Sequence, residues 1–203
     1  METLHERLRQ RYARGDVPWD AVLPPPEVMA LADQLPPGRA LDLGCGYGRT
    51  AIYLAQKGWQ VDGVDFVELA LEEAARRAAA AGVVVNFHHA SVTDLGFLQG
   101  PYDLAVDVGC GHNLDEAALR AYRDQLQRLL RPGAPFLFIA RLRPPDAAVE
   151  EEEAGPRGLD EALFRRLFAI AFTLERFERG VTEMDVDNSW ASGWFWWRRH
   201  AKV

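Results

Sequence analysis

Short apolar runs alternate along the chain with longer stretches in which apolar residues recur every three or four positions. The mainly apolar runs over residues 40–43, 60–65, 83–89, 102–108 and 135–140 have the length and composition of buried strands. Glycine or proline stands near the end of each intervening segment. This alternation of strands and helices predicts an α/β fold with one doubly wound sheet and helices on both faces.

Two further strands, residues 172–177 and 194–200, are predicted near the end of the chain. Alternation over residues 194–197 places two tryptophans on one face and a phenylalanine and a tryptophan on the other, as in a strand covered on both sides. Trp190 is expected in the loop before this strand. The predicted helices cover residues 2–14, 27–34, 49–57, 69–81, 116–130 and 159–169.

The first predicted strand ends in a glycine-rich turn. Asp42 is followed by Gly44, Gly46 and Gly48, each separated by one residue, and a helix begins directly after them. Glycines in such a turn let the backbone approach a ligand at the carboxyl end of a parallel sheet, although the turn can also serve packing alone. The spacing differs from the dinucleotide fingerprint, because Arg49 stands where that fingerprint has its third glycine. A buried carboxylate such as Asp42 needs a cation or a hydrogen-bond donor opposite it.

An acid also ends the second predicted strand. Asp65 lies 17 positions beyond Gly48, near the roughly 20 positions expected for an acid that binds ribose hydroxyls. Alternatively, Asp65 caps the helix over residues 69–81. Both roles are compatible, but the preceding glycine turn favours the ribose, and Phe66 is then expected against the adenine.

Length, charge and cysteine content restrict the functions that the protein is expected to have. The 203 residues are expected to form a single domain, residues 1–203, and the net charge of −7 argues against a protein that binds nucleic-acid phosphates. Since the chain has no apolar leader and no run of roughly 18 apolar residues, we expect a cytoplasmic protein without a membrane span. Cys45 and Cys110 form neither a disulfide framework nor a zinc set. His88 and His89 are adjacent, so a strand directs them to opposite faces, and no metal site is expected.

The Asp-x-Gly-x-Gly-x-Gly turn resembles motif I of the class I S-adenosylmethionine-dependent methyltransferases. The Leu-Leu-Arg-Pro-Gly sequence at residues 129–133, before the fifth strand, also looks like this superfamily. The resemblance extends over nearly the whole chain. It implies a Rossmann-like sheet of seven strands in the order 3-2-1-4-5-7-6, with the last strand antiparallel.

The resemblance further implies S-adenosylmethionine as cofactor and S-adenosylhomocysteine as its product. Asp42 would orient the ammonium group, the glycine backbone would approach the amino-acid portion, and Asp94 would accept from the adenine amino group. Asp94 alternatively forms an Asx turn. The residues expected at the cofactor are Trp19, Asp42, Gly44, Cys45, Gly46, Gly48, Asp65, Phe66, Ser91, Val92, Asp94 and Asp107.

Residues 15–20, Gly-x-x-Pro-Trp-Asp, resemble the arm before motif I in the branch that contains thiopurine, tellurite/selenite and halide/thiol methyltransferases. This similarity favours an N-terminal arm, residues 1–26, that covers the glycine turn as a lid. On residue chemistry alone, Trp19 could equally plug the side of the core. A proline pair at 144–145 and an acidic run at 150–153 are expected to form a solvated excursion over the same edge of the sheet.

The branch implies a thiol, a halide or a chalcogen oxyanion as methyl acceptor. Because the methyl group is already activated on a sulfonium, we expect no obligatory catalytic base, and a Cys110–His112 nucleophile is disfavoured. The acceptor is thus a small molecule, while its identity and the oligomeric state stay open. The residues expected at the acceptor are Trp19, Tyr47, Asp107, His112, Asn113 and Trp190.

Three other functions compete with this interpretation. A nicotinamide-dependent oxidoreductase also uses a glycine turn and a ribose acid, but the segment around Asp94 and the glycine spacing favour the methyltransferase. A binding scaffold without activity would not need the intact turn or Asp65. A nucleic-acid methyltransferase is disfavoured by the negative charge and by the lack of an Asn-Pro-Pro-Tyr-type base-flipping loop.

Overall fold

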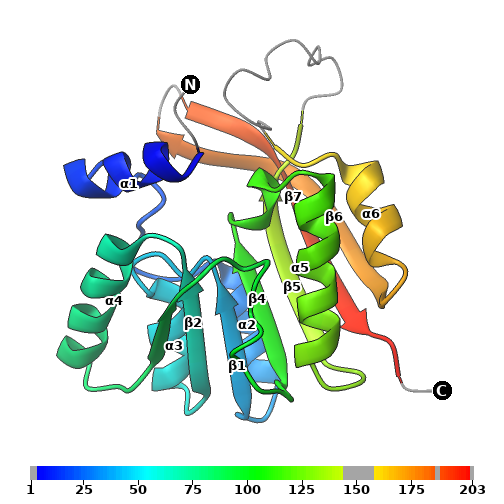
Figure 1. The fold of residues 1–203 in the computed structure, drawn as a ribbon, viewed down its shortest axis with the longest axis horizontal. Coiled ribbons are helices and arrows are strands. Elements are labelled where there is room, and N and C mark those ends of the chain that lie inside the picture. The colour runs from blue at the N-terminus through cyan, green and yellow to red at the C-terminus, as the bar shows by residue number, and fades with distance from the viewer. Residues whose placement is uncertain (1–3, 144–157, 186–187, 202–203) are drawn as a thin grey trace.

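The computed structural model describes residues 4–143, 158–185 and 188–201, and these form an α/β structure around one seven-stranded sheet (Figure 1). The strand order is β3-β2-β1-β4-β5-β7-β6. The pairs of β7 with β5 and with β6 are antiparallel, and all other neighbouring strands are parallel. The predicted fold class and strand order are therefore confirmed. The excursion expected at residues 144–145 and 150–153 lies outside the described residues.

The elements follow the predicted succession of strands and helices. The strands are β1 (Arg39–Leu43), β2 (Gln60–Asp65), β3 (Asn86–His89), β4 (Leu104–Val108), β5 (Pro135–Arg141), β6 (Phe172–Asp185) and β7 (Asn188–Arg199). The helices are α1 (Leu4–Arg14), α2 (Pro26–Gln34), α3 (Arg49–Gln56), α4 (Glu68–Ala80), α5 (Glu116–Leu129) and α6 (Glu161–Phe168), with a short 3-10 turn, η1 (Gly111–Asn113).

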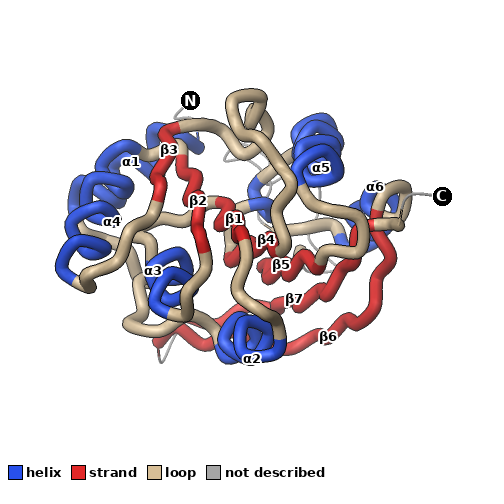
Figure 2. The backbone as a smooth tube through the Cα atoms, turned by 90° about the horizontal axis from the view of Figure 1, so that it is seen from below, coloured by secondary structure: helices blue, strands red, loops and turns tan. Residues whose placement is uncertain are grey.

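Helices cover both faces of the sheet. Figure 2 shows α5 and α6 on one face and α2 and α3 on the other. Val28 of α2 and Leu54 of α3 pack on the second face against Val61 and Leu104 of the central strands. Because apolar residues on both sides of β1, β4 and β5 are covered, these strands are hydrophobic at nearly every position, as buried parallel strands require.

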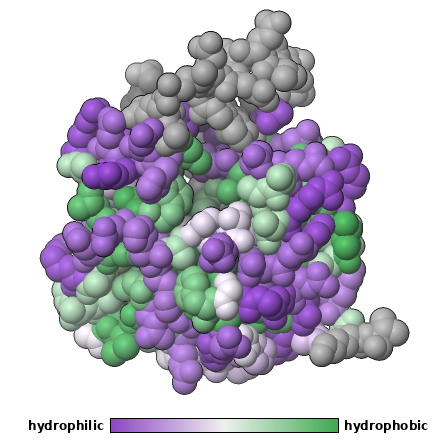
Figure 3. Space-filling model, viewed as in Figure 1, coloured by the Kyte–Doolittle hydropathy of each residue, from purple (hydrophilic) through white to green (hydrophobic). Residues whose placement is uncertain are grey.

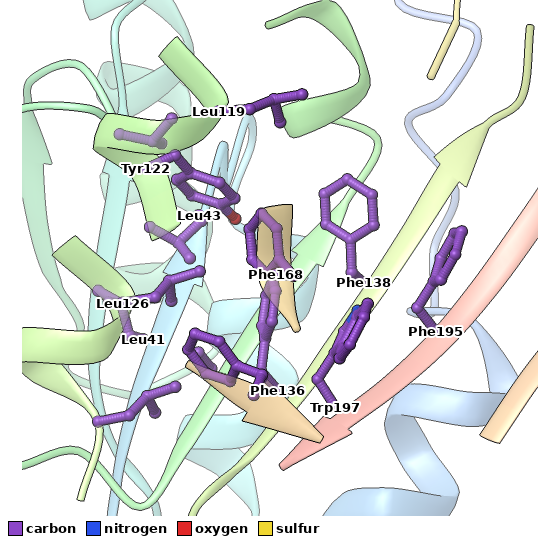
Figure 4. Close-up of a cluster of buried hydrophobic side chains, with 14 of the residues drawn as sticks. Leu41, Leu43, Leu119, Tyr122, Leu126, Phe136, Phe138, Phe168, Phe195 and Trp197 are labelled. Atoms are coloured by element: carbon purple, nitrogen blue, oxygen red, sulfur yellow. The ribbon is translucent and has the colours of Figure 1, made fainter. Parts of the chain in front are cut away.

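The face under α5 and α6 holds a cluster of aromatic side chains (Figure 4). The ring of Phe164 in α6 lies 4.4 Å from that of Phe138 and 4.2 Å from that of Phe168, measured between ring centroids. Trp197 of β7 meets Phe164 edge-on at 5.8 Å. Each such side chain contributes roughly 1.5–3 kcal/mol by burial alone, so this cluster anchors the antiparallel strands to the parallel part of the sheet.

The alternation expected over residues 194–197 is present in β7. Phe195 and Trp197 are fully buried in the aromatic cluster. Trp194 and Trp196 lie on the opposite face, half-buried against the side that α2 and α3 cover. The position of these four aromatic residues is therefore explained by the sheet and not by a ligand.

The last two strands are longer than their sequence pattern indicates. β6 and β7 continue as a hairpin past the edge of β5, and Trp190 pairs with Thr182 inside it. The expectation that Trp190 lies in a loop is therefore wrong. The alternation of apolar and polar residues fails here because this part of the hairpin pairs only with itself and has no core beneath it. In Figure 1 the hairpin reaches the same end of the molecule as α1.

Candidate active site

The described residues form a cavity of about 700 Å³ at the carboxyl ends of the parallel strands. Its floor is the glycine turn after β1. One wall comes from α1 and the segment that follows it, and another from η1 and the far part of β7. Figure 3 shows hydrophobic atoms between the hydrophilic outer face of α1 and the body of the protein. α1 turns Leu4 and Leu8 toward this cavity, which explains its amphipathic pattern.

The glycines of the turn are required by close packing. Gly44 has a φ of 70°, and a Cβ there would lie 2.3 Å from the Cβ of Cys110. Gly46 has a φ of 52°, and a Cβ there would lie 2.8 Å from the hydroxyl of Tyr12. Side chains at these positions would therefore strain the backbone and fill the floor of the cavity. Cys110 is packed beneath the turn and burial raises its pKa, as expected for a structural thiol.

Asp65 ties the end of β2 to the glycine turn. One carboxylate oxygen accepts from the backbone N–H of Gly46 and the other from that of Val67, both at 2.9 Å. The N-cap position of α4 is Val67 and no side chain caps the helix, so the capping role considered for Asp65 is not the one observed. Asp65 lines the cavity, and burial raises its pKa.

Asp42 is the least satisfied group of the site. It is 2% exposed, it lines the cavity, and its Oδ2 has no hydrogen-bond partner among the described residues. Burial and then the charge of Asp107 raise the pKa of Asp42 to about 7. A buried carboxylate with a free oxygen facing a cavity is suited to a cationic ligand group.

Asp107 is also buried, but its hydrogen bonds are complete. Its carboxylate accepts from the backbone N–H groups of Cys110 and Gly111 at 2.8 and 3.0 Å and from the Tyr122 hydroxyl at 2.8 Å. Burial raises its pKa to about 7. Asp107 does not line the cavity, so the geometry gives it the task of shaping the loop before η1 and does not support the direct ligand contact that we expected.

Two further predicted residues, Gly48 and Asp94, lie outside the cavity lining. Gly48 is buried with a φ of 79°, where a Cβ would lie 3.1 Å from Ala74 and from Phe87, so it lets α3 pack against α4 and β3. Asp94 is exposed, and its backbone N–H donates to the carbonyl of Ser91 in a backbone turn, which is not the Asx turn considered as its alternative role. The lining does include Trp19, Gly44, Cys45, Gly46, Tyr47, Phe66, Ser91, Val92, His112, Asn113 and Trp190.

His112 and Asn113 of η1 face the cavity from the side opposite α1. Nδ1 of His112 is buried without a hydrogen-bond partner among the described residues. Burial, and then the charge of Arg141, lower the pKa of His112 to about 4, so its imidazole is neutral at neutral pH. The side chain of Asn113 donates to the carbonyl of Cys110 at 3.1 Å, which holds η1 in place.

Aromatic and ionic contacts fix the segment after α1 over the glycine turn. The Trp19 indole donates to the Tyr12 hydroxyl at 3.3 Å, and the Tyr12 ring meets that of Tyr47 edge-on at 5.1 Å. Arg77 of α4 makes two hydrogen bonds of 2.8 Å to the carboxylate of Asp20. These contacts place Trp19 at the cavity and not in the side of the core.

Sequence reasoning missed three residues of this site: Tyr12, Arg77 and Arg141. The helical spacing of Leu4, Leu8 and Tyr12 was a usable signal, because a short charged helix with one apolar stripe must cover something. Arg77 and Arg141 gave no such signal, since their partners, Asp20 and Trp190, are far away in the chain.

Comparison with known proteins agrees with this geometry. Residues 40–133 match the family model of a methyltransferase domain. Over 160 residues, 78% of the chain and 69% of the relative, the sequence is 28% identical to the 2-heptyl-1-hydroxyquinolin-4(1H)-one methyltransferase of Mycobacteroides abscessus. These similarities support S-adenosylmethionine-dependent methyltransferase activity, with S-adenosylmethionine as the cofactor.

Two solved structures resemble this methyltransferase over almost its whole length. One, described by the conversion of a disulfide bond into a thioacetal group during echinomycin biosynthesis, superimposes with a TM-score of 0.79 at 25% identity, over 97% of this chain and 92% of the other. The other is the 1,6-didemethyltoxoflavin-N1-methyltransferase of Burkholderia thailandensis with bound S-adenosylhomocysteine. It has a TM-score of 0.77 and 25% identity, and the alignment covers 97% of this chain and 87% of that one.

Two other kinds of site are absent from the described residues. They contain no group of three or more His, Cys, Asp or Glu residues that could hold a metal ion. In the same part of the chain, no helix is long and apolar enough to cross a membrane.

Asp42 and Asp107 should respond in opposite ways to substitution by asparagine. Because the folded methyltransferase holds the Asp42 proton more tightly than the unfolded chain, Asp42 makes the fold less stable as pH rises from about 4 to about 7. Asp42→Asn should therefore raise the melting temperature of the cofactor-free protein, more at about pH 8 than at about pH 5. Asp107→Asn should lower the melting temperature, with a loss of about 1–3 kcal/mol in unfolding free energy, since it leaves donors unpaired. Because burial also raises the pKa of Asp107 to about 7, this loss should be larger at about pH 5 than at about pH 8.

Thermal and urea unfolding at both pH values would check this pair. A destabilising Asp42→Asn at about pH 8 would show that its free oxygen is stabilised in a way that the geometry does not account for.

Proposed function

We propose that this enzyme transfers the methyl group of S-adenosylmethionine to a small molecule bound in the cavity. The observation that carries the proposal is the unpartnered oxygen of Asp42 on a cavity floor that the glycine turn keeps open. A carboxylate is retained in so unfavourable a position when a ligand supplies the missing charge, and the cofactor's ammonium group fits that requirement.

The other residues that we propose to contact the cofactor lie at the same edge of the sheet. The backbone of Gly44 and Gly46 would lie along the amino-acid portion. Each carboxylate oxygen of Asp65 accepts one backbone hydrogen bond and retains a lone pair, so Asp65 is able to accept from ribose hydroxyls as well. Phe66 and Val92, with the backbone of Ser91, would border the adenine. The predicted contact of Asp94 with the adenine amino group stays a proposal, and Asp94 is exposed outside the cavity lining.

Small organic compounds are the acceptor class that the similar proteins support. The relative from M. abscessus is named for a hydroxyquinolinone and the solved B. thailandensis enzyme for a didemethyltoxoflavin. The acceptor classes that we proposed from the sequence are thiols, halides and chalcogen oxyanions. All three attack the methyl group as anions. We retain that anionic character as the finer proposal. A nicotinamide-dependent oxidoreductase is not favoured, because the similar proteins are methyltransferases.

Positioning is the main catalytic task of this chain. S-adenosylmethionine supplies a methyl group already activated on a positively charged sulfur. The protein therefore has to align the acceptor and exclude water, and proximity of this kind is worth roughly 7–11 kcal/mol. The neutral, buried His112 has a pKa of about 4 and is a weak base, which agrees with a positioning role.

A direct test follows the methyl group itself. Purified protein is incubated with methyl-labelled S-adenosylmethionine and a panel of small thiols, halides, chalcogen oxyanions, phenols and amines. We expect label in at least one acceptor, and none with Asp42→Asn, whose affinity for both the cofactor and S-adenosylhomocysteine should fall at least tenfold. A melting temperature raised by nicotinamide dinucleotides but not by S-adenosylmethionine would contradict the proposal.

Substitution of His112 separates positioning from base catalysis. His112→Ala should retain measurable turnover at saturating cofactor, with its loss confined mainly to acceptor affinity. Calorimetric cofactor binding serves as the control for folding. A variant that binds cofactor normally but has lost all turnover would identify His112 as an obligatory base.

The arm formed by residues 1–26 is proposed as a lid. Nine residues between Leu4 and Asp20 line the cavity, and the His5 side chain lies 3.2 Å from the carbonyl oxygen of Phe66. The ion pair of Asp20 with Arg77 closes this arm onto α4, so opening it has to break that pair.

Arg77→Gln should therefore release the cofactor faster and weaken its binding about fivefold, as expected for the loss of roughly 1 kcal/mol from a half-exposed ion pair. Arg76→Gln is the matched control, because Arg76 forms an ion pair with Glu73 on the same helix. Stopped-flow dissociation of S-adenosylhomocysteine measures both variants. Equal rates for the two would show that the ion pair does not hold the arm.

A further inference from the structure

Arg141 has no assigned task in the proposed methyl transfer, although it lies in the same cavity. It is the last residue of β5 and is paired with Ser192 of β7. Its guanidinium carbon lies over the ring of Trp190, 5.5 Å from the centroid. Arg141 and Trp190 thus form a cation–aromatic pair from two adjacent strands, and both line the cavity.

The charge of Arg141 is not balanced within the described part of the chain. None of the ion pairs formed there involves Arg141, and its Nε is buried without a hydrogen-bond partner. A buried guanidinium nitrogen without an acceptor is costly, since it has lost water and gained nothing. An acceptor that enters the cavity would supply the partner that the described residues do not provide.

Charges of both signs line the cavity. Arg49, which interacts with the charge of Asp42, lies at the glycine turn, and Arg7 and Arg11 come from α1. Asp42 and Asp65 lie at the glycine turn, which we assign to the cofactor. Asp20, the third carboxylate of the lining, is already paired with Arg77. Arg141 stands with His112 on the far side, where burial and the charge of Arg141 keep that imidazole neutral. Because His112 is neutral, it does not compete with Arg141 for an anion, and its free Nδ1 is available for a hydrogen bond to a ligand.

We propose that Arg141 and Trp190 form the acceptor subsite of this methyltransferase and that they select a flat, conjugated anion, such as an aromatic thiolate or the anion of a hydroxylated heteroaromatic ring. Arg141 binds the negative charge, and the Trp190 ring provides a surface on which a planar acceptor stacks. The inference rests on the proposed methyl transfer and specifies its substrate.

The charge balance of the reaction suits this subsite. The nucleophilic atom of the anion bonds to the methyl carbon while the carbon–sulfur bond breaks and leaves its electron pair on sulfur. One anion and one sulfonium thereby become two neutral groups, and no proton has to be removed. The methylated product no longer carries the charge that Arg141 binds, so its affinity falls and it leaves.

Binding to the protein loaded with S-adenosylhomocysteine tests the subsite without turnover. The probes are 4-nitrothiophenolate, its neutral flat analogue 4-nitroaniline, and the saturated anion cyclohexanecarboxylate. We expect 4-nitrothiophenolate to bind at least tenfold more tightly than either of the others. Arg141→Gln should bind 4-nitrothiophenolate at least tenfold more weakly than the wild type, and Arg141→Lys should recover part of that affinity. Trp190→Leu should reduce the preference for 4-nitrothiophenolate over cyclohexanecarboxylate about threefold or more.

Arg143→Gln is the matched control, since Arg143 lies on the same segment but outside the cavity lining. S-adenosylhomocysteine affinity should stay within twofold in every variant, which shows that the fold and the cofactor site are intact. Equal affinity of the wild type for 4-nitroaniline, or unchanged anion affinity in Arg141→Gln, would overturn the subsite. If the anion binds through Arg141 but labelled methyl reaches no acceptor of the panel, the subsite stands and the proposed function fails.

Discussion

Three buried carboxylates at one edge of the sheet are the constraint on which the site depends. Asp42, Asp65 and Asp107 end β1, β2 and β4, and each is less than 9% exposed. Desolvation makes every one of them costly unless donors surround it. Asp107 is compensated by three donors, Asp65 by two backbone N–H groups, and Asp42 keeps an unpartnered oxygen. These hydrogen bonds shape the loops around the cavity. The unpartnered oxygen of Asp42 marks the place where a ligand group is expected.

The same edge shows how stability and function oppose one another in this enzyme. The pKa of Asp42 is raised to about 7, so at neutral pH the empty fold carries part of the cost of a buried charge. The aromatic cluster around Phe164 lies under the antiparallel half of the sheet and supplies apolar burial away from the cavity. A polar site with a buried, unpartnered carboxylate oxygen is thus carried by a fold whose aromatic cluster lies apart from it.

Two segments that lie far apart in the sequence complete the cavity above the sheet. The N-terminal arm contributes Tyr12 and Trp19, and the hairpin of β6 and β7 contributes Trp190. Neither segment belongs to the parallel part of the sheet that positions the cofactor. The glycine-turn side of the cavity is consequently built from the parallel strands, whereas the opposite side includes the hairpin. In the function proposed above, acceptor choice depends on the residues of that opposite side.

Local patterns in the sequence predicted the elements and the residues at the glycine turn, while the sheet order came from the family resemblance and not from any local pattern. Strand alternation, the glycine turn and the acid after β2 act over a few residues, so Asp42, Gly44, Gly46 and Asp65 could be predicted. Only the tertiary structure decided which side chains face the cavity. It turned Asp107 inward to three donors and extended β7 so that Trp190 meets Arg141. Such contacts join residues distant in the chain, and no local periodicity records them.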